Sequence, residues 1–130
     1  MAKKIDKKVI SQLQAYLDML PHYRNLDPHN KEFSYWNQQL IDYLIANFGN
    51  TSAEYIRYDG VKLAWLTENT PEAQRQAYID SLNKKETVLK AIIEELKKSI
   101  FEKIWYYIVY LWQVTVEKAF EGIFNSLKRP

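Results

Sequence analysis

Apolar residues recur every three or four positions through most of the chain, the spacing that places them on one side of an α-helix. The first such stretch, Ile5–Leu20, is closed by Pro21 and followed by a polar, turn-like segment up to Pro28. The second stretch begins with Asp27 or Asn30 as its cap, since both residue types cap helices well. Two amphipathic helices are therefore predicted before residue 50.

The second helix is expected to end at Gly49, because glycine readily adopts the left-handed backbone that closes many helices. Thr51, with Glu54 three residues later, forms a capping box and predicts a short third helix that ends near Asp59. The side chains around the following Asp-Gly pair also alternate as they do in a hairpin. We expect Val61–Leu66 to be irregular or extended.

A long helical pattern begins at Thr70, which with Pro71 has the order of a cap and a first-turn proline. Apolar residues then follow a seven-residue repeat that only Glu86 interrupts. A straight helix from here to the end of the pattern would be roughly 85 Å long, far more than a compact domain of this size spans. The pattern therefore predicts either a break, at 83–85 or at 97–99, or a helix that protrudes and finds a partner.

Together these patterns predict an all-α fold, a helical bundle of four to five helices with a long, aromatic-rich C-terminal helix pair. The 130 residues are expected to form a single helical domain. A subdivision into the N-terminal helices and irregular segment of 1–69 and the long C-terminal helices of 70–130 is compatible with the pattern. Only 3 Gly and 4 Pro are present, which is little material for the turns of an all-β fold.

Charge and composition exclude several function classes. A formal net charge of +2 is too small to predict nucleic acid as a partner. The chain has no cysteine, which excludes disulfides and thiolate metal sites, and its charged first residues are not followed by an apolar run. We therefore expect a cytoplasmic protein without metal or cofactor. No glycine-rich phosphate loop or nucleophile motif is present either, and this favours a non-enzymatic role.

One short motif points to chemistry nevertheless. Arg24 and Asn25 are followed by His29 in the spacing R-N-x-x-x-H, which resembles the signature of the HEPN superfamily of small helical ribonucleases. The resemblance implies metal-independent RNA cleavage through the ribose 2′-hydroxyl, with the arginine and histidine of two protomers meeting across a dimer interface. In that interpretation His29 moves the proton and Arg24 steadies the phosphate.

A second motif covers more of the chain, and its letters are Phe33, Trp36, Leu44, Phe48, Gly49, Ser52 and Tyr55. Together with the amphipathic residues 76–100, it resembles a helical region that precedes TIR-like or nuclease effector domains in bacterial defence-type proteins. The resemblance implies an accessory or assembly role in a bacterial system, without an activity of its own.

The most informative feature is Ile104–Val116, thirteen uncharged residues that are apolar or aromatic on nearly every side of a helix. Such a helix is either enclosed in the centre of its own bundle or covered by a partner, most simply a second copy of the chain. The leading hypothesis is a non-enzymatic interaction or oligomerisation module that binds itself or another protein. Docking on a membrane surface is a further alternative. The proposed working surface consists of Trp105, Tyr106, Tyr110, Trp112 and Phe120.

Overall fold

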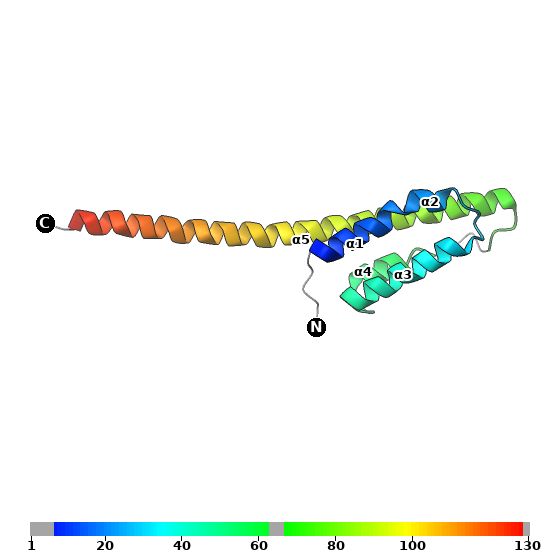
Figure 1. The fold of residues 1–130 in the computed structure, drawn as a ribbon, viewed down its shortest axis with the longest axis horizontal. Helices are drawn as coiled ribbons and strands as arrows, with labels where there is room; N and C mark the ends of the chain where they lie inside the picture. Colours follow the sequence, from blue (N-terminus) through cyan, green and yellow to red (C-terminus); the bar gives the residue numbers. More distant parts are fainter. Residues whose placement is uncertain (1–6, 63–66, 129–130) are drawn as a thin grey trace. The chain divides into compact units, whose positions relative to one another are not determined.

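The computed structural model describes residues 7–62 and 67–128, and every regular element in these ranges is a helix (Figure 1). The predicted all-α fold class is confirmed. The helices are α1 (Lys7–Asp18), α2 (Leu20–Arg24), α3 (Lys31–Phe48), α4 (Ala53–Asp59) and α5 (Pro71–Lys128). The chain divides into two compact units, residues 1–96 and residues 97–130. That it acts as a single domain stays a prediction.

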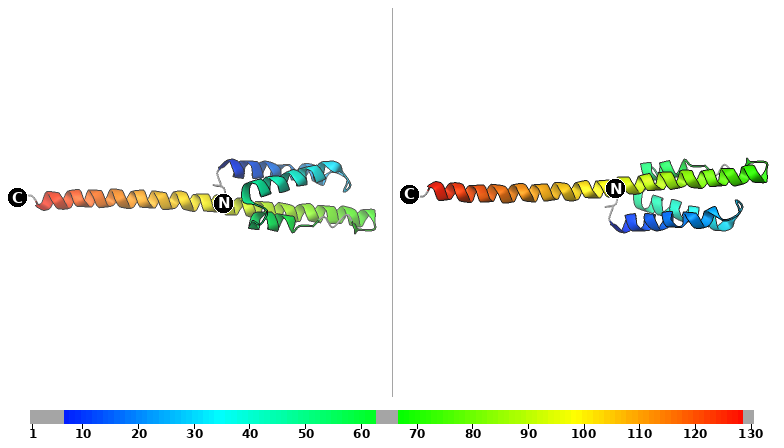
Figure 2. Two further views of the ribbon diagram at one scale, coloured as in Figure 1. Left: turned by 90° about the horizontal axis from the view of Figure 1, so that it is seen from below. Right: turned by 90° about the horizontal axis from the view of Figure 1, so that it is seen from above.

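The N-terminal unit is built around an aromatic cluster that joins α2, α3 and the first part of α5. Figure 2 shows the ribbon of these helices from two further directions. On α3, the rings of Phe33 and Trp36 stack with centroids 5.6 Å apart. Tyr23 of α2 packs 5.5 Å from Trp36, and Tyr78 of α5 meets Phe33 edge-on at 5.7 Å. Rings of this size remove large apolar areas from water, and their tilted and edge-on contacts are favourable in themselves. The cluster fixes how these helices pack.

Tyr78 also links α5 to the segment between α2 and α3. Its hydroxyl donates a hydrogen bond to the carbonyl oxygen of Tyr23 at 2.6 Å and lies 3.1 Å from Nδ2 of Asn30. Oδ1 of Asn30 in turn accepts from the backbone N–H of Phe33 at 2.7 Å. Asn30, rather than Asp27, is therefore the cap of α3, because its amide satisfies both the helix end and the buried tyrosine.

The residues that end α3 and begin α4 agree with the predicted helix caps, with one change. Gly49 has a φ of 95°, and its backbone N–H closes α3 on the carbonyl of Ile45. The short third helix is confirmed, but its cap is Ser52 and not Thr51. The hydroxyl of Ser52 accepts from the N–H of Tyr55 at 3.2 Å and donates to the carbonyl of Gly49 at 2.8 Å. One side chain thus connects two helix ends.

Two other local predictions, on the stretch after Pro21 and on Val61–Leu66, are confirmed only in part. The stretch after Pro21 is not wholly a turn, because Leu20–Arg24 forms α2 with Pro21 in its first turn. Leu20 and Tyr23 are buried, and that burial stabilises the extra turn of helix. Of the segment predicted to be irregular or extended, Val61 and Lys62 belong to no helix, and 63–66 lie outside the described residues.

The predicted helix breaks at 83–85 and 97–99 are wrong, since both places lie inside α5, and the expected C-terminal pair is one helix. At the first place, Asn83 accepts a hydrogen bond from Arg24 at 3.1 Å, and Lys85 is buried. Lysines dominate the second place, and lysine is a good helix former that does nothing to end the hydrogen-bond ladder.

Lys85 is a buried amine in the N-terminal unit. Its side chain is 2% exposed, and its Nζ lies 4.2 Å from the centroid of the Tyr58 ring, which attracts a cation. The Tyr58 hydroxyl donates to Oδ1 of Asn37 at 2.7 Å, so the polar group of the ring that covers the amine has a partner of its own. Burial lowers the pKa of Lys85 to about 8; Asp59 opposes the shift and Lys62 adds to it. The folded state therefore disfavours the charged amine.

We expect the free energy of unfolding to rise between about pH 8 and pH 10. Below pH 8 the amine is protonated in both states, whereas above pH 8 the unfolded chain, where the pKa is 10.5, binds more protons than the folded one. Above pH 10 the trend reverses, since burial raises the pKa of Tyr58 over its ordinary 10.0. Lys85→Met should raise the stability at pH 7 by about 1 to 2 kcal/mol and flatten this rise.

Urea denaturation at a fixed protein concentration measures both effects. A variant that is less stable than the parent at pH 7 and keeps the same rise would contradict this interpretation of Lys85.

Candidate functional site

Arg24, at the end of α2, is bound to α5 through its side chain and its carbonyl. Its guanidinium pairs with Glu86 and donates to Asn83, while its carbonyl oxygen accepts from Arg75 at 2.5 Å. Hydrogen bonds from Lys90 and Arg24 hold the pKa of Glu86 below its ordinary value. Glu86, which interrupts the apolar repeat of α5, is therefore the ion-pair partner of Arg24.

His29 lies at the surface, in the turn before α3, and contacts a different part of α5. Its Nε2 is 3.1 Å from Oε1 of Gln74, and its backbone N–H donates to Oδ1 of Asp27 at 2.8 Å. The contacts of Arg24 and His29 thus run to separate places on the long helix. Within the described part of one chain, the two side chains are not brought together into a site.

The letters of the second motif have local structural roles in the N-terminal unit. Phe33, Trp36 and Leu44 are buried in its core. Gly49 ends α3, and Ser52 begins α4. Each residue of the motif is explained by packing or by helix capping. The motif therefore stabilises the fold and contributes no reactive group.

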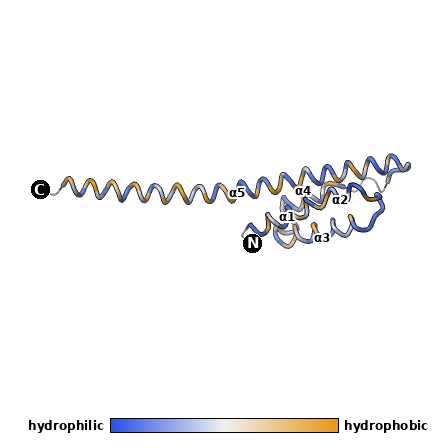
Figure 3. The backbone as a smooth tube through the Cα atoms, turned by 45° about the horizontal axis from the view of Figure 1, so that its top comes forward, coloured by the Kyte–Doolittle hydropathy of each residue, from blue (hydrophilic) through white to orange (hydrophobic). Residues whose placement is uncertain are grey.

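The C-terminal segment, residues 97–128 of α5, has no comparable cover. Nearly all its described side chains are exposed, among them Trp105 at 58%, Trp112 at 70% and Leu127 at 79%. Figure 3 shows hydrophobic positions recurring along the whole of this segment. Soluble proteins seldom leave a contiguous apolar surface of this extent without a partner. This segment is the candidate functional surface.

Because successive residues of a helix turn by about 100°, positions three, four and seven apart share a side. The apolar side of the segment consists of Phe101, Ile104, Trp105, Ile108, Trp112, Val116, Ala119, Ile123 and Leu127. The opposite side, called the charged side because it carries Lys103, Glu117 and Glu121, also holds Tyr106, Tyr110, Gln113, Val114 and Phe124. The segment is therefore amphipathic, and the aromatic stretch is not uniformly apolar.

This arrangement separates the five residues predicted to form the working surface. Trp105 and Trp112, two turns apart, lie together on the apolar side. Phe120 lies at its edge, whereas Tyr106 and Tyr110 lie on the charged side with their rings exposed. The sequence pattern could have revealed this division, since every charged residue of 101–128 avoids the apolar side.

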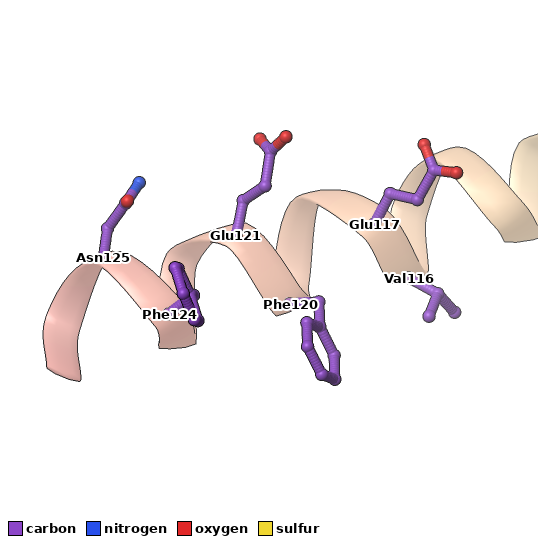
Figure 4. Close-up of a pocket in the computed structure, with 6 residues that line it drawn as sticks. All are labelled: Val116, Glu117, Phe120, Glu121, Phe124 and Asn125. Atoms are coloured by element: carbon purple, nitrogen blue, oxygen red, sulfur yellow. The ribbon is translucent and has the colours of Figure 1, made fainter. Parts of the chain in front are cut away.

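Figure 4 shows the two sides near the end of the segment: Glu117, Glu121 and Asn125 project one way, and Val116 and Phe120 the other. A shallow groove follows these residues together with Phe124. All its walls belong to one helix, so it cannot surround a small molecule as a ligand pocket does. An elongated apolar surface is better matched to another helix.

Among the described residues, no group of three or more His, Asp or Glu side chains is placed to hold a metal ion. None of the helices formed by these residues combines the length and apolarity that crossing a membrane requires.

We expect Arg24→Ala to lower the stability of the N-terminal unit by about 1 to 2 kcal/mol, since the half-buried Glu86 loses its arginine. His29→Ala, at an exposed position, should change the stability by less than about 0.5 kcal/mol. Urea denaturation of the full chain compares the two variants. A loss for Arg24→Ala as small as that expected for His29→Ala would show that Arg24 is not a structural residue.

Comparison with known proteins found no match, whether among family models, curated proteins or solved structures.

Proposed function

We propose that this protein is a non-enzymatic self-assembly module, in which the apolar side of the C-terminal segment packs against the same side of a second copy. The observation that carries the proposal is the exposure of Trp105 and Trp112 together on one side of a helix. An accessory role in a bacterial defence-type system, as the second motif implies, is compatible with such a module.

The available area supports a stable contact. From the exposed fractions of its side chains, the apolar side offers on the order of 800 Å² per chain, as each large aromatic ring carries about 150 to 250 Å². A standard protein interface takes about 800 Å² from each partner. The apolar side is thus large enough for a specific dimer.

Charge favours a second copy over a membrane. The C-terminal segment, residues 97–128, holds five lysines against three glutamates, a formal excess of only +2. Glu102, Glu117 and Glu121 interrupt the basic face that anionic lipid would attract, so the segment gains little from a membrane surface. In two copies, by contrast, lysines of one chain can pair with glutamates of the other. The tryptophans are the expected anchors, since large buried rings dominate most interfaces.

We expect the full chain to sediment as an oligomer of its 15.5 kDa subunit at micromolar concentration. Replacing Trp105 and Trp112 together by Glu places charge in the contact and should leave monomers. The matched control replaces Tyr106 and Tyr110 by Glu on the charged side and should still assemble. Sedimentation velocity makes the comparison.

A parent protein that stays monomeric throughout the micromolar range would contradict self-assembly. So would equal losses in the tryptophan and tyrosine variants. A monomer that floats with anionic vesicles would instead favour membrane-surface docking.

The alternative HEPN-like ribonuclease has its own test. If Arg24 and His29 are only structural, labelled RNA incubated with the full chain in the presence of a chelator should remain intact. Cleavage that is lost in both Arg24→Ala and His29→Ala, while the two variants remain folded, would establish the ribonuclease instead.

A further inference from the structure

Ile104–Val116 contains few residues that favour a helix by themselves. Of its thirteen residues, six are β-branched and five are aromatic, which leaves Leu111 and Gln113 as the good helix formers. β-Branched and aromatic side chains lose rotamer freedom in a helix, so this stretch has low intrinsic helicity. In the N-terminal unit, such weakness is offset by buried packing. In this stretch the side chains are exposed.

The same residues are favourable in a different conformation. A run that is β-branched, aromatic and uncharged, without proline or glycine, has high strand propensity. An exposed helix made of such residues competes with extended and unfolded states. What the helix has in its favour is the separation of its apolar and charged sides, and that separation stabilises it only when the apolar side is covered.

We propose that the helix of Ile104–Val116 folds as it assembles: the second copy covers the apolar side and thereby stabilises the helical state. This inference rests on the proposed self-assembly and adds that protein concentration controls the secondary structure of the segment. The helical C-terminal segment is then the conformation of the assembled protein. In a lone subunit the same stretch loses its helix, while the N-terminal unit keeps its own core.

Far-UV circular dichroism of the full chain, measured across its dissociation range, tests the coupling. Ile104–Val116 makes up about an eighth of the residues in the described helices. The signal per residue at 222 nm should therefore fall on dilution by roughly an eighth. The fall should have the same midpoint as dissociation measured by sedimentation. The variant with Glu at 105 and 112 should show the low signal at every concentration.

A second variant changes helicity without touching the apolar side. Replacing Tyr106 and Tyr110 by Ala raises the intrinsic helicity of the segment, so the concentration at half-assembly should fall about tenfold. If the helix were already formed in the monomer, this midpoint would not move.

A signal that stays constant while the oligomer dissociates would overturn the coupling and leave self-assembly standing. A chain that never associates would remove both. These two failures are distinguished by sedimentation alone.

Discussion

The fold depends on one constraint: the apolar side of a helix must be covered if the helix is to be stable in water. α5 meets this constraint in its first part, where four shorter helices of the N-terminal unit supply aromatic and aliphatic side chains. Tyr78, Leu82, Leu89 and Ile92 are fully buried there. The C-terminal segment has an apolar side of similar kind, yet its side chains remain exposed. The proposed function follows from this difference.

Polar contacts decide which surfaces meet in the N-terminal unit. Arg75 donates to the carbonyls of Arg24 and Leu26, and Tyr78 to that of Tyr23, so the segment after α2 is held by α5. Nη1 of Arg57, on α4, donates to both carboxylate oxygens of Glu95, at 3.0 and 2.8 Å. Such bonds add directional preference to a core whose apolar contacts are less specific.

Much of this architecture could be predicted from local patterns. The caps at Asn30 and Thr70 and the glycine at the end of α3 depend on residues within a turn of each other, which a sequence displays directly. Glu86 and Lys85 could not be interpreted in that way. Their partners, Arg24 and Tyr58, are distant in the chain. The two polar residues therefore resemble an interruption of α5 in the sequence, although in the structure each makes a specific contact with another helix.

The same limit, that a sequence pattern does not reveal distant contacts, applies to the candidate surface. The sequence alone indicated that Ile104–Val116 needs cover, and the helical register then placed its tryptophans and two of its tyrosines on different sides. Whether that cover is the chain's own core or a partner depends on tertiary contacts, which periodicity does not encode.

The position of Lys85 has a chemical consequence. Amine-acylating reagents attack neutral, accessible amines, and Lys85 becomes neutral near pH 8 while its side chain remains 2% exposed. Solvent-facing lysines such as Lys84 are open to such a reagent. Acylation of Lys85 therefore requires the packing around it, the Tyr58 ring included, to open, so the labelling rate at this one position reports how often the N-terminal unit opens.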